Sequence, residues 1–326
     1  MKKPLTRVLT ALSILSTAAM LSACGGATST VDPFKPVRVI GLGDGYNDVG
    51  SPAVSGSTQF TGGPYTVRST SEVGTVVEQL AAYFGVSATG TYVGDATYTS
   101  LPSTGTYSYA NGNSLIDGNN GLIQQVDRLL ADVTSFSSTD LVLITVGTQD
   151  IMAGTTQATA ISNLKAQVAR LLAANARHIL IVQPLEVTNT PWGRANNASS
   201  TYTGKTVAFI NAELVALQDL VRQGGFSNNP IIFTNATTLS SDFNIYTTTT
   251  PYLEFSASTQ VPYCSGTGAS SAGNSSYTDT KGCATTDGFV DTTYDTRLFA
   301  DGIHLTPAGN RWVATRVYYA TASGWR

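Results

Sequence analysis

Two short segments at opposite ends of the chain carry residue types that could perform hydrolytic chemistry. Near the C-terminus the sequence reads Asp301-Gly302-Ile303-His304. An Asp-x-x-His pair can orient a histidine as the general base that activates a hydroxyl nucleophile. Near the N-terminus, directly after an apolar run, the sequence reads Gly43-Asp44-Gly45-Tyr46-Asn47-Asp48. A tight turn after a strand can present a nucleophile, but this turn contains no serine.

The order of apolar segments predicts the elements that would position these residues. Apolar runs rich in β-branched residues predict buried strands at 37–42, 141–146, 179–182 and 230–233. Apolar residues at helical spacing predict helices at 76–84, 122–130, 161–172, 207–221 and 307–322. Strands that alternate with such helices form a flavodoxin-like three-layer α/β/α parallel sheet. Loops after parallel strands share one edge of the sheet, so the two segments are expected to meet there.

Three long segments show no pattern from which strands or helices can be predicted. They are residues 51–68, 87–119 and 237–295, and residues 87–119 are rich in Gly, Ser, Thr and Tyr. We expect loops in these segments, and loops on such a scaffold commonly determine ligand specificity.

Four sequence blocks, each following the previous one in the expected order, resemble the GDSL, or SGNH, hydrolase family. The blocks are residues 43–48, Tyr109-Ala110-Asn111-Gly112, Gly147-Thr148-Gln149-Asp150 and Asp301-Gly302-Ile303-His304. Each block is weak alone, but their order and their positions make the set specific. The resemblance implies the SGNH hydrolase fold and hydrolysis of acyl or acetyl esters.

The resemblance also implies a role for each site residue. A serine at position 45 would attack the ester, His304 would take its proton, and Asp301 would orient His304. The backbone N–H groups of residue 45 and Gly112 and an asparagine at position 149 would stabilise the oxyanion. This chain has Gly45 and Gln149 instead, and loss of one oxyanion donor typically costs about 10²–10³ in rate. We expect Gly45→Ser to create esterase activity if the rest of the machinery is intact.

These substitutions leave three functional hypotheses. The chain is an impaired or non-catalytic member that binds a ligand in its cleft. Alternatively, it is an active carboxylic-ester hydrolase that uses a displaced hydroxyl or a water activated by His304. The displaced candidates are Tyr46, Ser51, Ser55 and Ser114. A third hypothesis is a structural envelope protein whose cleft is filled.

Other short patterns have simpler interpretations. The glycines of Gly41-x-Gly43-x-Gly45 lack the spacing and the acidic partner of a dinucleotide-binding turn. His178 precedes a predicted strand, at the wrong edge of the sheet, and is interpreted as a polar residue at a helix–strand junction. No metal site and no cofactor are expected.

The first residues of the chain have the pattern of an export signal. Basic residues precede an apolar stretch at 8–21, and Leu21-Ser22-Ala23-Cys24 follows. The last four residues resemble a bacterial lipobox, which implies acylation of Cys24 after removal of residues 1–23. We expect residues 24–36 to form a tether and residues 37–326 a single SGNH hydrolase-like domain. Because Gly25 follows the cysteine, the family rule implies the outer membrane of a Gram-negative bacterium.

Charge and cysteine content fit an exported protein. Removal of residues 1–23 takes away three positive charges and changes the formal net charge from −3 to −6. An acidic chain does not suit nucleic acid, which requires a basic face. The expected partners are therefore the membrane, through the lipid, and an acyl or acetyl ester or a glycan. Cys264 and Cys283 are expected to form a disulfide that stabilises the fold by roughly 3 kcal/mol.

Overall fold

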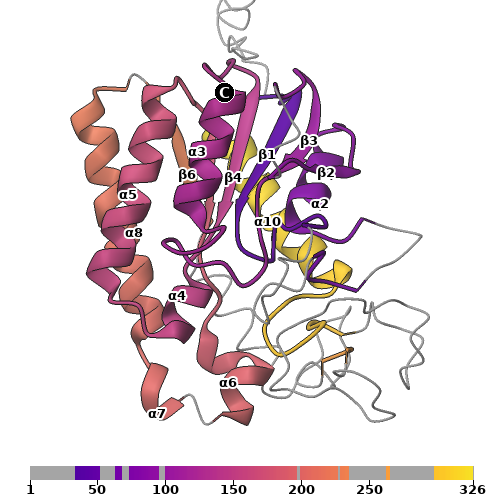
Figure 1. Ribbon diagram of the computed structural model, residues 1–326, viewed down its shortest axis with the longest axis vertical. Coiled ribbons are helices and arrows are strands. Elements are labelled where there is room, and N and C mark those ends of the chain that lie inside the picture. Colours follow the sequence, from indigo (N-terminus) through magenta and orange to yellow (C-terminus); the bar gives the residue numbers. More distant parts are fainter. Residues whose placement is uncertain are drawn as a thin grey trace, which may run out of the picture. The chain divides into compact units, whose positions relative to one another are not determined.

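A computed structural model describes residues 34–51, 63–67, 73–94, 100–196, 199–226, 228–234, 262–264 and 297–325. Within these residues six strands form a parallel sheet in the order β2-β3-β1-β4-β5-β6 (Figure 1). The strands are β1 (Arg38–Gly43), β2 (Gly90–Tyr92), β3 (Gly105–Ser108), β4 (Asp140–Thr145), β5 (Ile179–Val182) and β6 (Ile231–Phe233). The first strand is central, and Ile40 is in register with Tyr107 on β3 and Val142 on β4.

Helices cover both faces of this sheet. One face packs against α3 (Leu122–Asp132), α5 (Gln157–Ala173) and α8 (Lys205–Gly224). The other face packs against α2 (Val76–Tyr83) and α10 (Pro307–Gly324). Successive side chains of a strand point to opposite faces, so Ile40 and Leu42 enter the first core and Val39 enters the second. The side chains in both cores are almost completely buried. Because both faces of the central strands are covered, these strands are continuous apolar runs in the sequence and do not alternate with polar residues.

The predicted three-layer α/β/α fold is confirmed. The strands predicted at 37–42, 141–146, 179–182 and 230–233 are β1, β4, β5 and β6, and all five predicted helices are present. Figure 1 shows α3 and α10 on opposite sides of the strands. Four short helical segments lie beyond the carboxyl ends of the strands. They are α4 (Thr148–Ala153), the 3-10 turn η1 (Val187–Asn189), α6 (Pro191–Ala195) and α7 (Ser199–Tyr202).

The prediction that residues 87–119 form only a loop is wrong. This segment contains β2 and β3, which extend the sheet on one side of β1. Neither strand has an aliphatic run, because β2 is a partly exposed edge and β3 satisfies its buried polar groups by hydrogen bonds. Ser108 Oγ, for example, donates to the carbonyl of Asn47 over 2.6 Å. Hydrogen-bonded polar side chains hide a strand from a periodicity search.

Phe34, the first residue that the structure describes, lies at the amino edge of the sheet. The Phe34 ring stacks on His178, with centroids 3.8 Å apart, and both rings contact Trp325. Burial lowers the pKa of His178 to about 4. His178 therefore belongs to the packing at this edge, as the sequence suggested, and lies far from the carboxyl ends of the strands. In the part of the chain that the structure describes, no helix is long and apolar enough to span a membrane.

Candidate active site

The turn after β1 is forced by a close approach of two strands. Gly43 has φ of +109°, and a β-carbon there would lie 1.8 Å from the carbonyl oxygen of Thr145 on β4. Only glycine fits such a position. The next amide, of Asp44, donates to that same oxygen over 2.9 Å. The chain thus leaves the sheet at its carboxyl edge, with Gly45 at the turn.

Two polar side chains hold this turn in place. Asn47 Nδ2 donates to the carbonyls of Leu42 and Leu143, at 3.0 and 3.3 Å. The Asp48 carboxylate is fully buried and accepts from the backbone amides of Gly50 and Ser51, at 2.9 and 2.7 Å. Burial nevertheless raises the pKa of Asp48, while these hydrogen bonds oppose the shift. The turn is therefore fixed to β1, to β4 and to the segment after it by buried hydrogen bonds.

Asp301 and His304 form a hydrogen-bonded pair in the loop before α10. Asp301 Oδ2 lies 2.8 Å from His304 Nδ1, and its Oδ1 accepts from the amides of Ile303 and His304, at 2.8 and 2.6 Å. An ionised carboxylate only accepts, so Nδ1 carries the proton and Nε2 is left as the acceptor. Both side chains are almost completely buried, which excludes bulk water from the pair.

The Nε2 edge of His304 faces Gly45. A β-carbon built on Gly45 would lie 2.5 Å from Nε2 and 2.7 Å from Cδ2 of this ring, closer than real β-carbons come. The tertiary structure thus brings together the two segments that the sequence predicted to meet. It also shows that the histidine ring fills the volume that a larger residue at position 45 would need.

Tyr65 packs against the site from a second side, and no sequence pattern predicted it. Its ring is tilted against His304, with centroids 4.9 Å apart, and a β-carbon on Gly112 would lie 1.8 Å from its Cε2. The neighbouring Thr66 Oγ1 donates to the carbonyl of Leu305 over 2.9 Å, which ties this segment to the histidine loop. Tyr65 lies in the segment 51–68, whose composition carries no periodic signal.

Two of the three groups assigned to an oxyanion hole by resemblance, Gly112 and Gln149, already have acceptors. The Gly112 amide donates to Asp48 Oδ2 over 2.8 Å. Gln149, near the start of α4, directs its Nε2 to the side-chain oxygen of Asn113 over 3.0 Å. Gly112 was expected to keep an available backbone donor; instead, a buried carboxylate accepts from it. An oxyanion would have to displace both existing hydrogen bonds.

The displaced hydroxyls considered from the sequence also have other acceptors. Tyr46 donates to the carbonyl of Ile303 over 2.7 Å, and burial raises the pKa of its phenol well above the ordinary value. Ser51 Oγ donates to Asp48 over 2.5 Å, and Ser114 Oγ donates to the carbonyl of Gly43 over 2.9 Å. Three of the four candidates are thus directed away from His304. Ser55, Cys24 and Cys283 lie outside the described residues.

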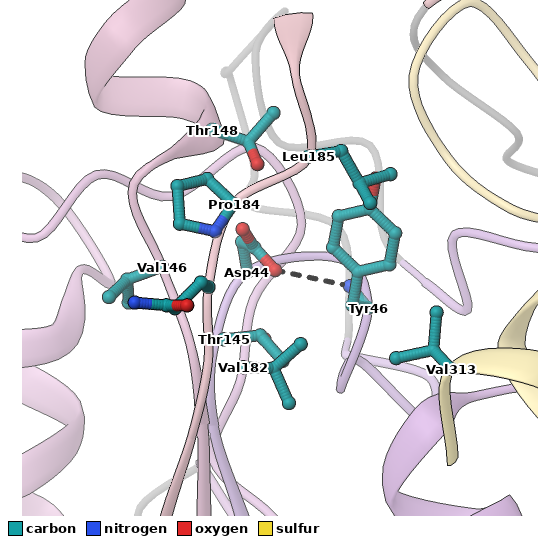
Figure 2. A pocket seen from close by; sticks show the side chains of 10 residues that line it. Asp44, Tyr46, Thr145, Val146, Thr148, Val182, Pro184, Leu185 and Val313 are labelled. Carbon is teal, nitrogen blue, oxygen red and sulfur yellow. Dashed lines mark hydrogen bonds between the residues drawn. The ribbon is translucent and has the colours of Figure 1, made fainter. Parts of the chain in front are cut away.

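Asp44 is a further carboxyl beside this site (Figure 2). It faces a cavity of about 10 Å³, which has room for about one water molecule. The cavity is lined by Asp44, Tyr46, Thr145, Val146, Thr148, Val182, Gln183, Pro184, Leu185 and Val313. Burial raises the pKa of Asp44 to about 6, opposed by its hydrogen bond with Thr145 and by nearby His304. Asp44 is therefore a buried polar group that one water could solvate.

A larger cavity lies at the carboxyl edge, outside the dyad. Its volume is about 310 Å³, at the low end of the range for small-molecule sites. It is lined by Ile151, Gly154, Thr155, Thr156, Gln157, Lys205 and Phe209, from α4, α5 and α8. Among the described residues, no group of three or more His, Cys, Asp or Glu side chains is placed to hold a metal ion.

Comparison with known proteins identifies the family of this chain. The family model described as GDSL-like Lipase/Acylhydrolase matches residues 39–317, a range that includes all four sequence blocks. An acetyl xylan esterase from Geobacillus stearothermophilus is similar in structure, with 11% sequence identity and a TM-score of 0.41. That match covers 90% of this chain and 98% of the other. Comparison with curated proteins finds no match. Because the family match extends over most of the sequence, this chain belongs to the GDSL-like lipase and acylhydrolase family.

Proposed function

We propose that this chain is an envelope lipoprotein of the GDSL family that has lost serine-dependent ester hydrolysis. One observation carries the proposal: His304 Nε2 lies 2.5 Å from the point where a β-carbon of residue 45 would be. A hydrolase of this family needs a hydroxyl between that histidine and the substrate. Here the glycine supplies no hydroxyl, and the ring occupies the space beside it.

The surrounding contacts support the same conclusion. Tyr65 covers Gly112 and His304, and the amide groups of Gly112 and Gln149 have protein acceptors. Compared with the serine-dependent site that the resemblance implies, this chain differs in the nucleophile, in the oxyanion donors and in the space beside the histidine. One compensating change could restore hydrolysis after the loss of a single part, but not after the loss of all three. The Gly112 amide donates to Asp48 and the Gln149 amide donates to Asn113, so neither donor is directed at a transition state.

Hydrolysis of p-nitrophenyl acetate and butyrate tests the proposal. The purified chain is expected to show no turnover above the buffer rate, and a fluorophosphonate probe is expected to label no serine. His304→Ala is the matched control, because it removes the base and leaves position 45 unchanged. Turnover by the unmodified chain that disappears in His304→Ala would show that ester chemistry survives.

The preserved pair of Asp301 and His304 favours one second candidate, direct attack by water. The pair keeps its 2.8 Å hydrogen bond, which holds the imidazole in the orientation that a general base requires. Such a hydrolase would turn over esters without labelling by the fluorophosphonate probe. His304→Ala and Asp301→Asn would both abolish that turnover. Labelling of a serine would indicate a displaced nucleophile instead.

Ligand binding at the larger cavity separates a binding role from a purely structural one. Ile151 and Phe209 offer apolar contacts there, and Thr155, Gln157 and Lys205 offer polar ones. This mixture suits an acylated or acetylated glycan. Binding of acetylated xylo-oligosaccharides, measured by calorimetry and weakened by Phe209→Ala, would support the binding role. Absence of any binding, together with the closed dyad, would favour a structural envelope protein.

The proposed anchoring depends on Cys24 and is tested separately. Metabolic labelling with a radioactive fatty acid is expected to mark the protein, and Cys24→Ser is expected to remove the label. Fractionation should recover the labelled protein with the outer membrane. An unlabelled protein in the soluble fraction would refute the anchoring without affecting the proposal about hydrolysis.

A further inference from the structure

Phe34, the first described residue, and the candidate site lie at opposite edges of the sheet. Phe34 precedes β1 and contacts His178, which precedes β5, at the amino edge. Gly45 follows β1 at the carboxyl edge. A strand of six residues separates them by about 20 Å. Any tether upstream of Phe34 therefore attaches at the end of the domain opposite His304.

A chain of aromatic contacts leads from Phe34 to the surface. Ring centroids are 6.3 Å apart for Phe34 and Phe84, and 5.1 Å apart for Phe84 and Tyr318. Tyr318 then stacks on Tyr83 at 5.5 Å and contacts Tyr319 at 5.8 Å. Exposure increases along this path, to 39% for Tyr83 and 67% for Tyr319. We call Tyr83, Tyr318 and Tyr319 the tyrosine face.

The helix that carries Tyr318 and Tyr319 also carries two arginines, while α2, which carries Tyr83, has one acidic residue, Glu78. The helix α10 carries Arg311 and Arg316 and no acidic residue. The Arg316 guanidinium lies over the Trp312 ring, 5.4 Å from its centroid. Tyrosine and tryptophan with neighbouring arginines are the side chains that membrane interfaces favour, because aromatic rings enter the headgroup layer and cations pair with anionic lipid.

We propose that the tyrosine face docks on the lipid headgroup layer of the membrane that holds the anchor. This inference rests on the acylated Cys24 of the proposed function. Cys24 precedes Phe34 by ten residues, so the lipid lies no more than about 35 Å along the chain from the aromatic path. The anchor would hold the face within reach of the lipid, and the face itself is expected to bind vesicles without the anchor.

Docking in this way has a consequence for the candidate site. The amino edge of the sheet rests on the bilayer, and the carboxyl edge with Gly45 and His304 points away from it. The ligand would then be a soluble or wall-bound molecule, and the lipid of the same membrane would not reach the site.

The test uses the chain from residue 24 with Cys24→Ser, so that binding does not depend on acylation. Cosedimentation measures its binding to vesicles of phosphatidylethanolamine and phosphatidylglycerol. The paired substitution Tyr83→Ser and Tyr319→Ser is expected to weaken binding by about tenfold or more, because it removes both of the more exposed rings. The matched control is Val207→Ser with Val215→Ser, which removes two apolar side chains of 53% and 59% exposure from α8, on the other sheet face.

Each possible result supports or overturns docking of the tyrosine face on lipid. Docking is supported if the tyrosine variant binds vesicles more weakly, the valine variant binds them as before, and the circular dichroism of both is unchanged. Equal binding of all three proteins, or no binding to the vesicles, overturns it. Dimerisation that the tyrosine variant loses, without vesicle binding, would assign the face to a second copy and also overturn it. A Cys24 without acyl chains would refute the anchor, while the vesicle result would still decide the docking.

Discussion

His304 Nε2 lies 2.5 Å from the position that a β-carbon on Gly45 would take, so the base of this site occupies the space beside the nucleophile position. The ring is held there by Asp301 on one side and by Tyr65 on the other. A substitution at position 45 must therefore move a buried, hydrogen-bonded ring. The residue at position 45 and the position of the His304 ring therefore depend on each other.

Gly45→Ser is predicted to remain inactive on p-nitrophenyl esters and to destabilise the fold. Its β-carbon overlaps His304 Nε2, and overpacking of a buried site typically costs about 1–3 kcal/mol. The amide of Gly112 would still be bonded to Asp48. Denaturant unfolding and ester turnover measure the two effects.

Gly45→Ala is the matched control for that variant, because it adds the same β-carbon without a hydroxyl. Both variants are expected to lose similar free energy of unfolding. Turnover by Gly45→Ser alone would show that the ring moves aside and that the oxyanion donors remain usable. Turnover only in combination with Gln149→Asn would show that the side-chain donor was the missing part.

Tyr65→Ala is predicted to open the site to reagents. His304 and Tyr65 are each 1% exposed, and their rings pack against each other with centroids 4.9 Å apart. Removal of a buried aromatic ring costs about 3–5 kcal/mol, so the experiment requires mild conditions in which the variant stays folded. Modification by diethylpyrocarbonate, located by peptide mass spectrometry, should reach His304 in this variant and not in the unmodified chain.

Tyr65→Phe keeps the ring and serves as the control for that experiment. Its His304 is expected to stay protected, with the peptide that contains His178 as the internal reference in all samples. Equal modification of His304 in the unmodified chain and in both variants would show that Tyr65 does not close the site.

The free energy of unfolding is predicted to fall as the pH rises from about 7 to about 8, because of Glu213. This residue of α8 is fully buried, and burial raises the pKa of its carboxyl from 4.5 to about 8, partly offset by the Gln183 side chain. Between these two values the folded chain keeps a proton that the unfolded chain releases. Higher pH therefore favours unfolding, by up to about 1.4 kcal/mol per pH unit.

Glu213→Gln isolates this effect, since glutamine has the same shape and does not titrate. The pKa values of Asp44 and Asp150 are about 6, so these carboxyls are largely ionised above pH 7 in both states. The variant is expected to lose less stability than the unmodified chain over this pH interval. Parallel curves for the two proteins would contradict the buried, protonated state of Glu213.

Cys264 and Cys283 are predicted to be paired. Cys264 is 1% exposed. Thiol titration of the unfolded Cys24→Ser chain should detect no free thiol before reduction. Cys283→Ala should expose one thiol and lower the free energy of unfolding by roughly 3 kcal/mol, as loop-closure entropy predicts. The double variant Cys264→Ala and Cys283→Ala should be no less stable than the single one, unless the thiol of Cys264 stabilises by packing alone.

The fold could be predicted from local sequence because its main signals are short in range. The aliphatic runs of β1, β4 and β5 and the periodic stripes of α5 and α8 are visible in windows of a few residues. The polar strands β2 and β3 could not be seen in this way, because hydrogen bonds to distant groups such as the Asn47 carbonyl stabilise them. The short helices after β5 likewise lack an apolar stripe.

The sequence by itself determined the family blocks, the hydrogen-bonding residue types Asp301 and His304, and the absence of a hydroxyl at Gly45. Only the tertiary structure decided what surrounds them. It placed His304 against Gly45, the Tyr65 ring over Gly112, and the carboxylate of Asp48 on the Gly112 amide. These contacts join segments far apart in the chain, and they depend on the volumes and hydrogen bonds of the packed state, which no local pattern encodes.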